Sequence, residues 1–365
     1  MVFTDVLASV RGTCVWASLA MFAGACGGGT AASPPPLFQG QGPAAGNPKG
    51  HCAVPAEAQQ EDTSHPTTVV GTGTAASCTG GAFVDAVAKG GVITFDCGPA
   101  PATITLTATA KVFNDTTPKI VIDGGGKVTL SGGGRVRILY QDTCDEKQKF
   151  TTSHCQDQDT PQLTVQNLTF ADGNSTGQTT DGGGGGAIFV RGGRFKALNS
   201  RFFDNVCELT GDDIGGGAIR VLSQSMNRPV YVVGCTFGGA PGLGNKGSSG
   251  GGLSSIGVSY TVLDSLFSYN EATGSKAAGG GNGGGIANDG NTYTLTVCGT
   301  DLNHNTANQG GGAIFYVSND RSGAVVVQDS TIVGNPNVGF ETDGLPGMFV
   351  LAKSPAQVTG STITK

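Results

Sequence analysis

Charged residues are scarce in this sequence. The 365-residue chain holds 21 Lys and Arg and 27 Asp and Glu, together 13 % of its residues, about half of the roughly 25 % that is typical of globular domains. This low content argues against long helices with charged surfaces. The net charge is −6 and the basic residues form no stripe, which excludes a nucleic-acid partner because nothing would neutralise its phosphates.

The N-terminal segment lacks the length of a membrane-spanning helix. The uncharged run 12–25 is too short to cross a membrane as a mature helix and instead predicts a signal peptide. It ends at Ala25-Cys26 before three glycines and resembles the lipobox of bacterial lipoproteins, although Ala23 stands where leucine is usual. We expect a lipoprotein-type signal peptide over residues 1–25 and a lipid on Cys26. Ordinary cleavage after Ala25, giving a secreted protein, is the alternative.

Residues 26–66 lack a pattern of apolar positions. They are rich in Gly, Ala, Pro and Gln, and such a segment cannot bury enough surface to fold alone. We therefore expect a flexible tether over residues 26–66, followed by one folded domain over residues 67–365.

Metal-binding spacings are absent. The four histidines are scattered and no two cysteines form a CxxC pair, so we expect no metal site and no cofactor. Eight cysteines follow Cys26, and an even number in an exported chain predicts disulfides. The likeliest pairs by sequence proximity are Cys144–Cys155 and Cys78–Cys97. Cys207, Cys235 and Cys298 are not assigned; Cys235 lies at a small-residue position of a repeat and can instead be a buried apolar side chain.

Glycine is abundant, at 63 residues, and accompanies an internal repeat. A short element of the type Val-x-x-Ser-x-Phe recurs every 30 to 35 residues, and its third position falls at 167, 199, 234, 264, 299, 329 and 360. Between these copies lies Gly-Gly-Ala-Ile or a variant of it, starting at 185, 216, 251, 284 and 311. The repeat contains short alternating β-type runs that cannot bury an apolar side without a neighbour, so the units must stack.

Parallel stacking of such units makes a β-helix in which equivalent residues form ladders along the axis. One inward ladder is expected at Ile188, Ile219, Leu253, Ile286 and Ile314, and another at Phe170, Phe202, Phe237, Phe267, Leu302 and Ile332. Asparagines three residues after the second ladder are expected to accept a left-handed backbone conformation and to bond to neighbouring main chain: Asn205, Asn270, Asn305 and Asn335. A short apolar helix over 77–88 is expected to close the N-terminal end.

The Gly-Gly-Ala-Ile and Phe-x-x-Asn elements, such as Phe202 to Asn205, resemble the repeats of polymorphic outer membrane proteins and of bacterial β-helix surface proteins. The resemblance covers about residue 67 to the end. It implies an all-β fold, a right-handed parallel β-helix with a short N-terminal capping helix. It also implies display at the bacterial outer membrane or cell surface, with the lipid as the anchor.

The same fold carries pectate lyases, polygalacturonases and uronan epimerases, so an enzyme is an alternative. Lyases of this type need clustered carboxylates and a basic residue, and glycosidases need two carboxylates flanking the bond. The outward positions beside the isoleucine ladder contain no row of carboxylates. The best catalytic candidates are corner residues, each with a solvated or turn-capping role as the alternative: Asp181, Asp212, Asp213, Asp289, Asp320 and Arg321.

Alternation along the strands also predicts a binding face. If the isoleucine ladder points inward, then Phe189 and Phe315 point outward with Arg220 between them, which suits a sugar or a partner surface unless corner loops cover the rings. We expect a surface-displayed lipoprotein with a non-catalytic binding, adhesion or structural role, bound to the membrane by its lipid and to a polysaccharide or cell-surface partner. A polysaccharide-active lyase, epimerase or hydrolase is the alternative, and an inert spacer is the third possibility.

Overall fold

The computed structural model describes residues 38, 40, 42–179 and 183–365, all within one compact unit, Leu37–Lys365. The expected signal peptide, the expected lipidation site Cys26 and the catalytic candidate Asp181 lie outside the described residues. Among the described residues, no helix has both the length and the apolar character needed to cross a membrane.

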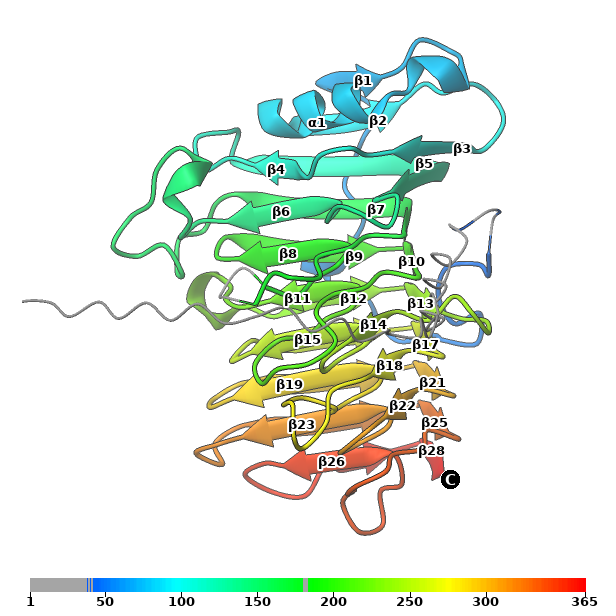
Figure 1. The fold of residues 1–365 in the computed structure, drawn as a ribbon, viewed down its shortest axis with the longest axis vertical. Helices are drawn as coiled ribbons and strands as arrows, with labels where there is room; N and C mark the ends of the chain where they lie inside the picture. Colours follow the sequence, from blue (N-terminus) through cyan, green and yellow to red (C-terminus); the bar gives the residue numbers. More distant parts are fainter. Residues whose placement is uncertain (1–37, 39, 41, 180–182) are drawn as a thin grey trace, which may run out of the picture. The chain divides into compact units, whose positions relative to one another are not determined.

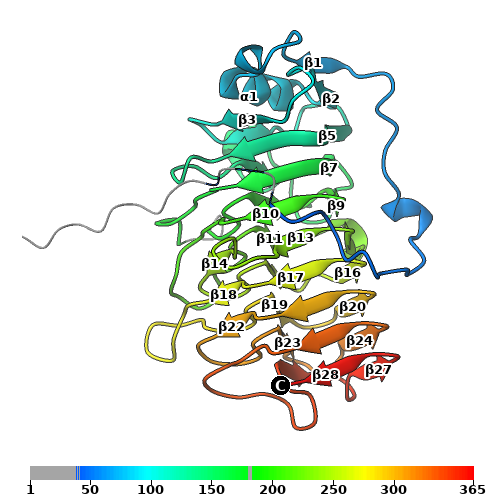
Figure 2. The same cartoon turned by 90° about the vertical axis from the view of Figure 1, so that its right-hand side faces the viewer.

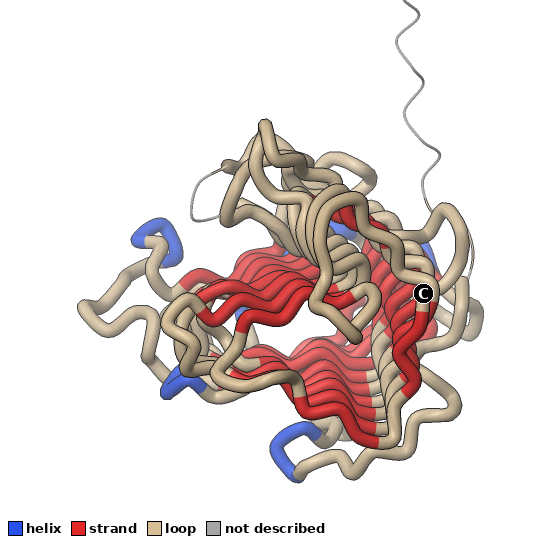
Figure 3. The backbone as a smooth tube through the Cα atoms, turned by 90° about the horizontal axis from the view of Figure 1, so that it is seen from below, coloured by secondary structure: helices blue, strands red, loops and turns tan. Residues whose placement is uncertain are grey.

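Parallel strands stack along a single axis and form a right-handed β-helix (Figure 1). One wall is a sheet of eight strands, which follow one another in chain order: β4 (Ala110–Val112), β6 (Leu139–Asp142), β8 (Ile188–Arg191), β11 (Ile219–Val221), β15 (Leu253–Ile256), β19 (Ile286–Gly290), β23 (Ile314–Ser318) and β26 (Met348–Leu351). Viewed along the axis, the strands of each wall lie one above the other (Figure 3). The fold class predicted from the repeats is confirmed.

The second sheet has 17 strands and folds around the axis as two columns. The first column contains β1 (Thr68–Val70), β2 (Gly91–Phe95), β9 (Arg194–Leu198), β12 (Val230–Val233), β16 (Tyr260–Leu263), β20 (Thr294–Cys298), β24 (Ala324–Gln328) and β27 (Gln357–Thr359). The second contains β3 (Ala102–Thr105), β10 (Arg201–Phe203), β13 (Thr236–Gly238), β17 (Leu266–Ser268), β21 (Asp301–Asn303), β25 (Thr331–Val333) and β28 (Thr362–Thr364). Two long strands, β5 (Lys119–Ser131) and β7 (Gln162–Ala171), run through both columns. A small third sheet comprises β14 (Lys246–Gly247), β18 (Glu271–Ala272) and β22 (Thr306–Ala307).

Both predicted apolar ladders form the core. The isoleucine ladder pairs in register from Ile188 to Ile314 and continues to Leu139 and Met348 at its ends, with every side chain fully buried. The aromatic ladder stacks Phe170, Phe202, Phe237 and Phe267 with ring centroids 5.1, 4.6 and 4.4 Å apart. Leu302 and Ile332 extend it in register.

The repeat also fixes the turn between the two columns. The third repeat position has a φ between 46° and 61° in every copy, where Asn, Asp or Gly is always present: Asn167, Asn199, Gly234, Asp264, Gly299, Asp329 and Gly360. These residue types tolerate the left-handed region best. The turn chemistry therefore explains the composition of this position.

The predicted asparagines form a buried ladder, but not in the backbone conformation that was expected. The left-handed residue is the one before each asparagine, for example Asp204 (φ 49°) and His304 (φ 54°). Each ladder side chain instead accepts hydrogen bonds from its neighbour one coil earlier through Oδ1 and donates through Nδ2, as Asn270 does to Asn305 at 2.9 Å. Asn245 is an additional rung between Asn205 and Asn270, bonded to both.

A single α-helix, α1 (Gly80–Lys89), packs at the end of the stack where the first strands lie (Figure 1). Thr79 accepts the N–H of Ala82 at its start, Gly90 ends it at a φ of 73°, and the buried side chains Phe83 and Val87 join the core. It contacts β4, β1 and β2. The prediction of an N-terminal capping helix over 77–88 is therefore wrong in its place: β1 and residues 42–66 precede α1 in the chain. Four short 3-10 helices complete the described elements: η1 (Ala56–Ala58), η2 (Ala75–Ser77), η3 (Glu146–Gln148) and η4 (Ser225–Asn227).

The structure differs from the tether prediction over the part that it describes. Residues 42–66, here called the strap, lie along the solenoid, where they contact the turns between the two columns (Figure 2). Gly46 donates to Thr236 Oγ1 at 2.9 Å, and Cys52 forms a disulfide with Cys298, 246 residues away. The strap is held by the folded domain because its own polar groups pair with the solenoid, which composition alone does not reveal.

The two disulfides predicted from sequence proximity are confirmed. Disulfides join Cys78 to Cys97 and Cys144 to Cys155. Cys235 is a free, fully buried thiol in the core, and burial raises its pKa to about 12. Cys207 is also free and buried.

Candidate functional site

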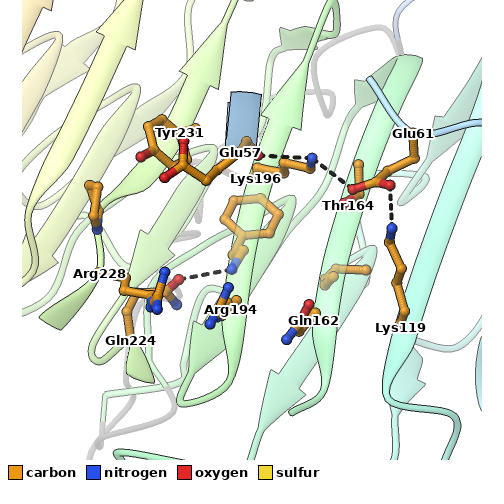
Figure 4. A pocket seen from close by; sticks show the side chains of 13 residues that line it. Glu57, Glu61, Lys119, Gln162, Thr164, Arg194, Lys196, Gln224, Arg228 and Tyr231 are labelled. Atoms are coloured by element: carbon orange, nitrogen blue, oxygen red, sulfur yellow. Dashed lines mark hydrogen bonds and ion pairs between the residues drawn. The ribbon is translucent and has the colours of Figure 1, made fainter. Parts of the chain in front are cut away.

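A cavity of about 310 Å³ lies between the strap and the outer face of the first column. We call it the strap groove; Figure 4 shows the side chains that line it. Its lining residues are Glu57, Glu61, Lys119, Gln162, Leu163, Thr164, Arg194, Phe195, Lys196, Gln224, Arg228, Pro229 and Tyr231. Four of these are basic and two are acidic, in a chain whose net charge is negative.

Strand register places the groove side chains in two rows. Lys119, Gln162 and Arg194 pair across β5, β7 and β9. The second row, two residues further along each strand, contains Thr164 in β7, then Lys196 in β9 paired with Tyr231 in β12. Since alternate residues of a strand face the same side, both rows face outward while Leu163 and Phe195 between them are buried in the core.

Glu61 of the strap bridges two lysines at one end of the groove. Its Oε1 lies 2.7 Å from the Nζ of Lys196, and its other carboxylate oxygen contacts the Nζ of Lys119. Burial raises the pKa of Glu61, but the hydrogen bonds and charges of Lys119 and Lys196 outweigh that effect, so its pKa lies below the ordinary value. The carboxylate therefore stays ionised at neutral pH.

The main chain of the strap is held separately from this carboxylate. The amide of Gln166, which is almost fully buried, accepts the N–H of Glu61 at 2.9 Å and donates to its carbonyl at 3.0 Å. Thr63 donates to Asp123 at 2.9 Å. Lys196 adds hydrogen bonds to the carbonyls of Glu57 and Gln59.

The other end of the groove holds two arginines. Arg194 pairs through Nε with Asp159 at 2.6 Å and its side chain remains about one third exposed. Arg228 is exposed and makes no ion pair with any described residue. Tyr231, in β12 beside Lys196, is half-buried, and burial, then the charge of Glu57, raises its pKa.

These groups suit binding better than acid/base catalysis. A general acid needs a carboxyl group whose pKa is raised towards neutrality, whereas the pKa of Glu61 is lowered. Guanidinium and ammonium groups around a half-buried phenol instead offer charge-assisted hydrogen bonds to an anion and a ring face for a sugar.

The predicted catalytic candidates gather in part at a second cavity, the corner pocket, of about 290 Å³. Asp212, Asp213 and Asp289 line it together with Arg220 and Phe315. Arg220 is almost fully buried and donates to the carbonyl of Asp213 and to Ser254 Oγ at 3.4 Å.

Two aspartates of the corner pocket hold backbone or side-chain groups of neighbouring loops. Asp289 accepts from the N–H of Gly290 at 2.6 Å and from Asn319 at 2.9 Å, and Asp212 accepts from the N–H of Gly280 at 3.1 Å. No group of three or more His, Cys, Asp or Glu side chains that could hold a metal occurs in the described part of the chain.

Asp320 and Arg321 do not line the corner pocket. Asp320 caps a turn: its Oδ1 accepts from the N–H of Ser322 at 3.0 Å and from the hydroxyl of the same residue at 2.6 Å, which lowers its pKa. Arg321 occupies the left-handed position of that turn, with a φ of 57°. The contacts of Asp320 are those of the turn-capping alternative.

The predicted binding residues do not form one exposed face. Phe189 is fully buried, stacked on Tyr140 at 5.2 Å with the guanidinium of Arg137 5.1 Å from its centroid. Phe315 is half-buried and stacks on Phe349 at 5.4 Å. The ring of Phe189 is therefore unavailable to a ligand, whereas the covered-face alternative, in which corner loops bury both rings, is not met at the half-buried Phe315.

The strap groove was not among the sequence predictions. The signal that could have found it is period-two alternation in the first column, which puts Lys119, Arg194 and Lys196 on the outer side of neighbouring coils. No sequence pattern predicts that Glu57 and Glu61 line the groove, because the strap contains no repeat.

Comparison with protein-family models, curated proteins and solved structures finds no match to this chain. Assignment of a function therefore depends on the geometry of the groove and the corner pocket.

Proposed function

We propose that this protein is a surface-displayed, non-catalytic binding protein that holds a polysaccharide or another cell-surface partner on the outer face of its β-helix. The observation that carries the proposal is the strap groove, where four basic side chains and a half-buried tyrosine surround a cavity of about 310 Å³. Function on a solenoid fold resides in such grafted surfaces rather than in the fold.

The proposal includes export and a lipid on Cys26 as the anchor. Three disulfides in the described chain support an oxidising compartment outside the cytosol. Mass spectrometry of protein recovered from membranes tests the anchor: we expect an acylated N-terminal Cys26, and an unmodified Cys26 would refute it.

Binding without turnover is tested with purified protein and a panel of neutral and acidic polysaccharides. We expect retention of at least one polysaccharide, weakened by Arg194→Gln together with Arg228→Gln, and no new reducing ends or unsaturated products. Lack of binding to every polysaccharide and to whole cells would reject the proposal.

A polysaccharide-active enzyme is the second candidate function, favoured by the corner pocket. Three predicted aspartates, Asp212, Asp213 and Asp289, line it with the basic side chain of Arg220. Robust product formation that is lost in Asp289→Asn would establish this alternative and displace our proposal.

A further inference from the structure

The strap groove contains an internal anion. The Glu61 carboxylate contacts Lys119 and Lys196, while at the other end Arg194, paired through Nε with Asp159, is about one third exposed and Arg228 is exposed. We infer that the groove takes the carboxylates of an acidic, uronate-type glycan, and that Glu61 occupies one of its two anion subsites until such a ligand arrives. This inference rests on the proposed function and specifies its ligand.

The spacing of the basic groups fits a chain with repeated carboxylates. Lys119 and Arg194 stand in one row, with Gln162 between them. Neighbouring strands lie about 4.8 Å apart, so the two backbone positions are about 10 Å apart along the axis. A glycan lying parallel to the axis can then place separate carboxylates at the two ends of the groove while Tyr231 offers a ring for stacking.

The Glu61 side chain can leave its position between the two lysines while the main chain of the strap stays attached. The main chain at Glu61 is fixed by Gln166, and Thr63 is fixed by Asp123, so neither contact depends on the Glu61 carboxylate. The Glu61 side chain is one fifth exposed. A ligand carboxylate can therefore replace it by a side-chain rotation, without detachment of the strap.

The negative charge of Glu61 competes with a ligand carboxylate for Lys119 and Lys196. An ionised Glu61 neutralises part of the charge of Lys119 and Lys196, the groups that a ligand anion needs. Glu61→Gln keeps the size and the main-chain contacts of this residue and removes only its charge. Affinity for an acidic glycan should consequently rise in this variant and fall when the arginines are removed.

The test is calorimetry of the full exported chain with oligogalacturonates and with neutral galactan oligomers of equal length. We expect binding of the acidic oligomers only, three- to tenfold tighter binding by Glu61→Gln, and at least tenfold weaker binding by Arg194→Gln/Arg228→Gln. The matched control is Lys276→Gln/Lys353→Gln, which removes two charges outside the groove and should bind as the wild type does. Binding to the acidic oligomers should also weaken as salt is added.

The outcomes separate this inference from the proposed function. If acidic and neutral oligomers bind equally, or if folded Glu61→Gln binds no tighter than the wild type, the carboxylate subsites are refuted while polysaccharide binding stands. If no oligosaccharide, polysaccharide or cell surface binds, the proposed function itself fails.

Discussion

Removal of one rung of the asparagine ladder should destabilise the solenoid strongly. The Asn270 side chain is fully buried and donates to Asn305 Oδ1 and to the Phe237 carbonyl, both at 2.9 Å. It accepts from the N–H and the Nδ2 of Asn245 at 3.1 and 2.8 Å. Asn270→Ala removes these four bonds, and at about 1 kcal/mol each the free energy of unfolding should fall by about 4 kcal/mol.

This loss can be measured as a shift of the thermal midpoint. With an unfolding entropy of about 2.1 cal/mol/K per residue over roughly 300 residues, 4 kcal/mol corresponds to about 6 °C. Circular dichroism and calorimetry should both report it. Asn291→Ala, at an exposed position, is the matched control and should change the midpoint by less than 1 °C, since surface substitutions cost within about 0.5 kcal/mol.

A double-mutant cycle then examines the coupling between rungs. Asn270→Ala and Asn305→Ala share one hydrogen bond, so the double variant should lose less stability than the sum of the two single variants. A midpoint for Asn270→Ala within 1 °C of the wild type, or strict additivity with Asn305→Ala, would refute the account of the ladder as a cooperative hydrogen-bonded stack.

Three further predictions concern the strap, the pH response and the aromatic residues. Cys52→Ser/Cys298→Ser should lower stability by up to roughly 5 kcal/mol, as expected from the 246-residue separation, and non-reducing peptide mapping of the wild type should show this pair; free thiols at both positions would contradict it. Burial, then a neighbouring carboxylate, raises the pKa of Asp204 to about 6, so the folded state binds its proton more tightly and stability should fall as the pH rises from about 4 through 6; Asp204→Asn should abolish this decline in melting experiments. Phe189→Ala should cost about 3 to 5 kcal/mol and Phe315→Ala clearly less, because only the former is fully buried; equal midpoints in thermal melts would overturn that distinction.

The repeated parts of the fold are predictable because the residue type at each repeat position is set by one physical requirement. The isoleucine and phenylalanine ladders follow from burial of one side of each strand, and their register is confirmed from Ile188 to Ile314. The third repeat position follows from its left-handed backbone, which only small or short polar residues tolerate well. Such requirements recur in every coil, so one sequence contains several independent examples of them.

Features that occur once are not predictable in this way. Asn245 escapes the Phe-x-x-Asn pattern because a longer corner, residues 238–244, separates it from Phe237, yet it bonds within the ladder as the others do. The position of the strap is not predictable because its partners are distant in sequence: Glu61 pairs with Lys196, and Cys52 with Cys298. The composition of the strap indicates that it cannot fold alone. It does not indicate whether the solenoid has a surface to which the strap binds.

The candidate site was also predicted only in part. Sequence reasoning brought Asp213, Asp289 and Arg220 forward, and all three line the corner pocket. It placed Phe189 on a surface, but the ring is buried against Tyr140. Alternation assigns a side of the strand correctly, whereas exposure on the outer side depends on which neighbouring side chains cover the residue, here Tyr140 and Arg137.

Departures from the repeat identify the residues that the solenoid itself does not require. The row that contains Lys196 and Tyr231 under the strap continues in register as Thr261, Thr296 and Val326 in the later coils. Those coils stack in the same register without any charge at this position, so the fold has no need of a lysine there. Lys196 instead holds the strap, because it pairs with Glu61 and donates to the carbonyls of Glu57 and Gln59. Lys119 and Arg194 likewise pair with Glu61 and Asp159, whereas the exposed Arg228 makes no ion pair with any described residue, so this fourth basic group of the cavity is better explained by an anionic ligand than by the architecture.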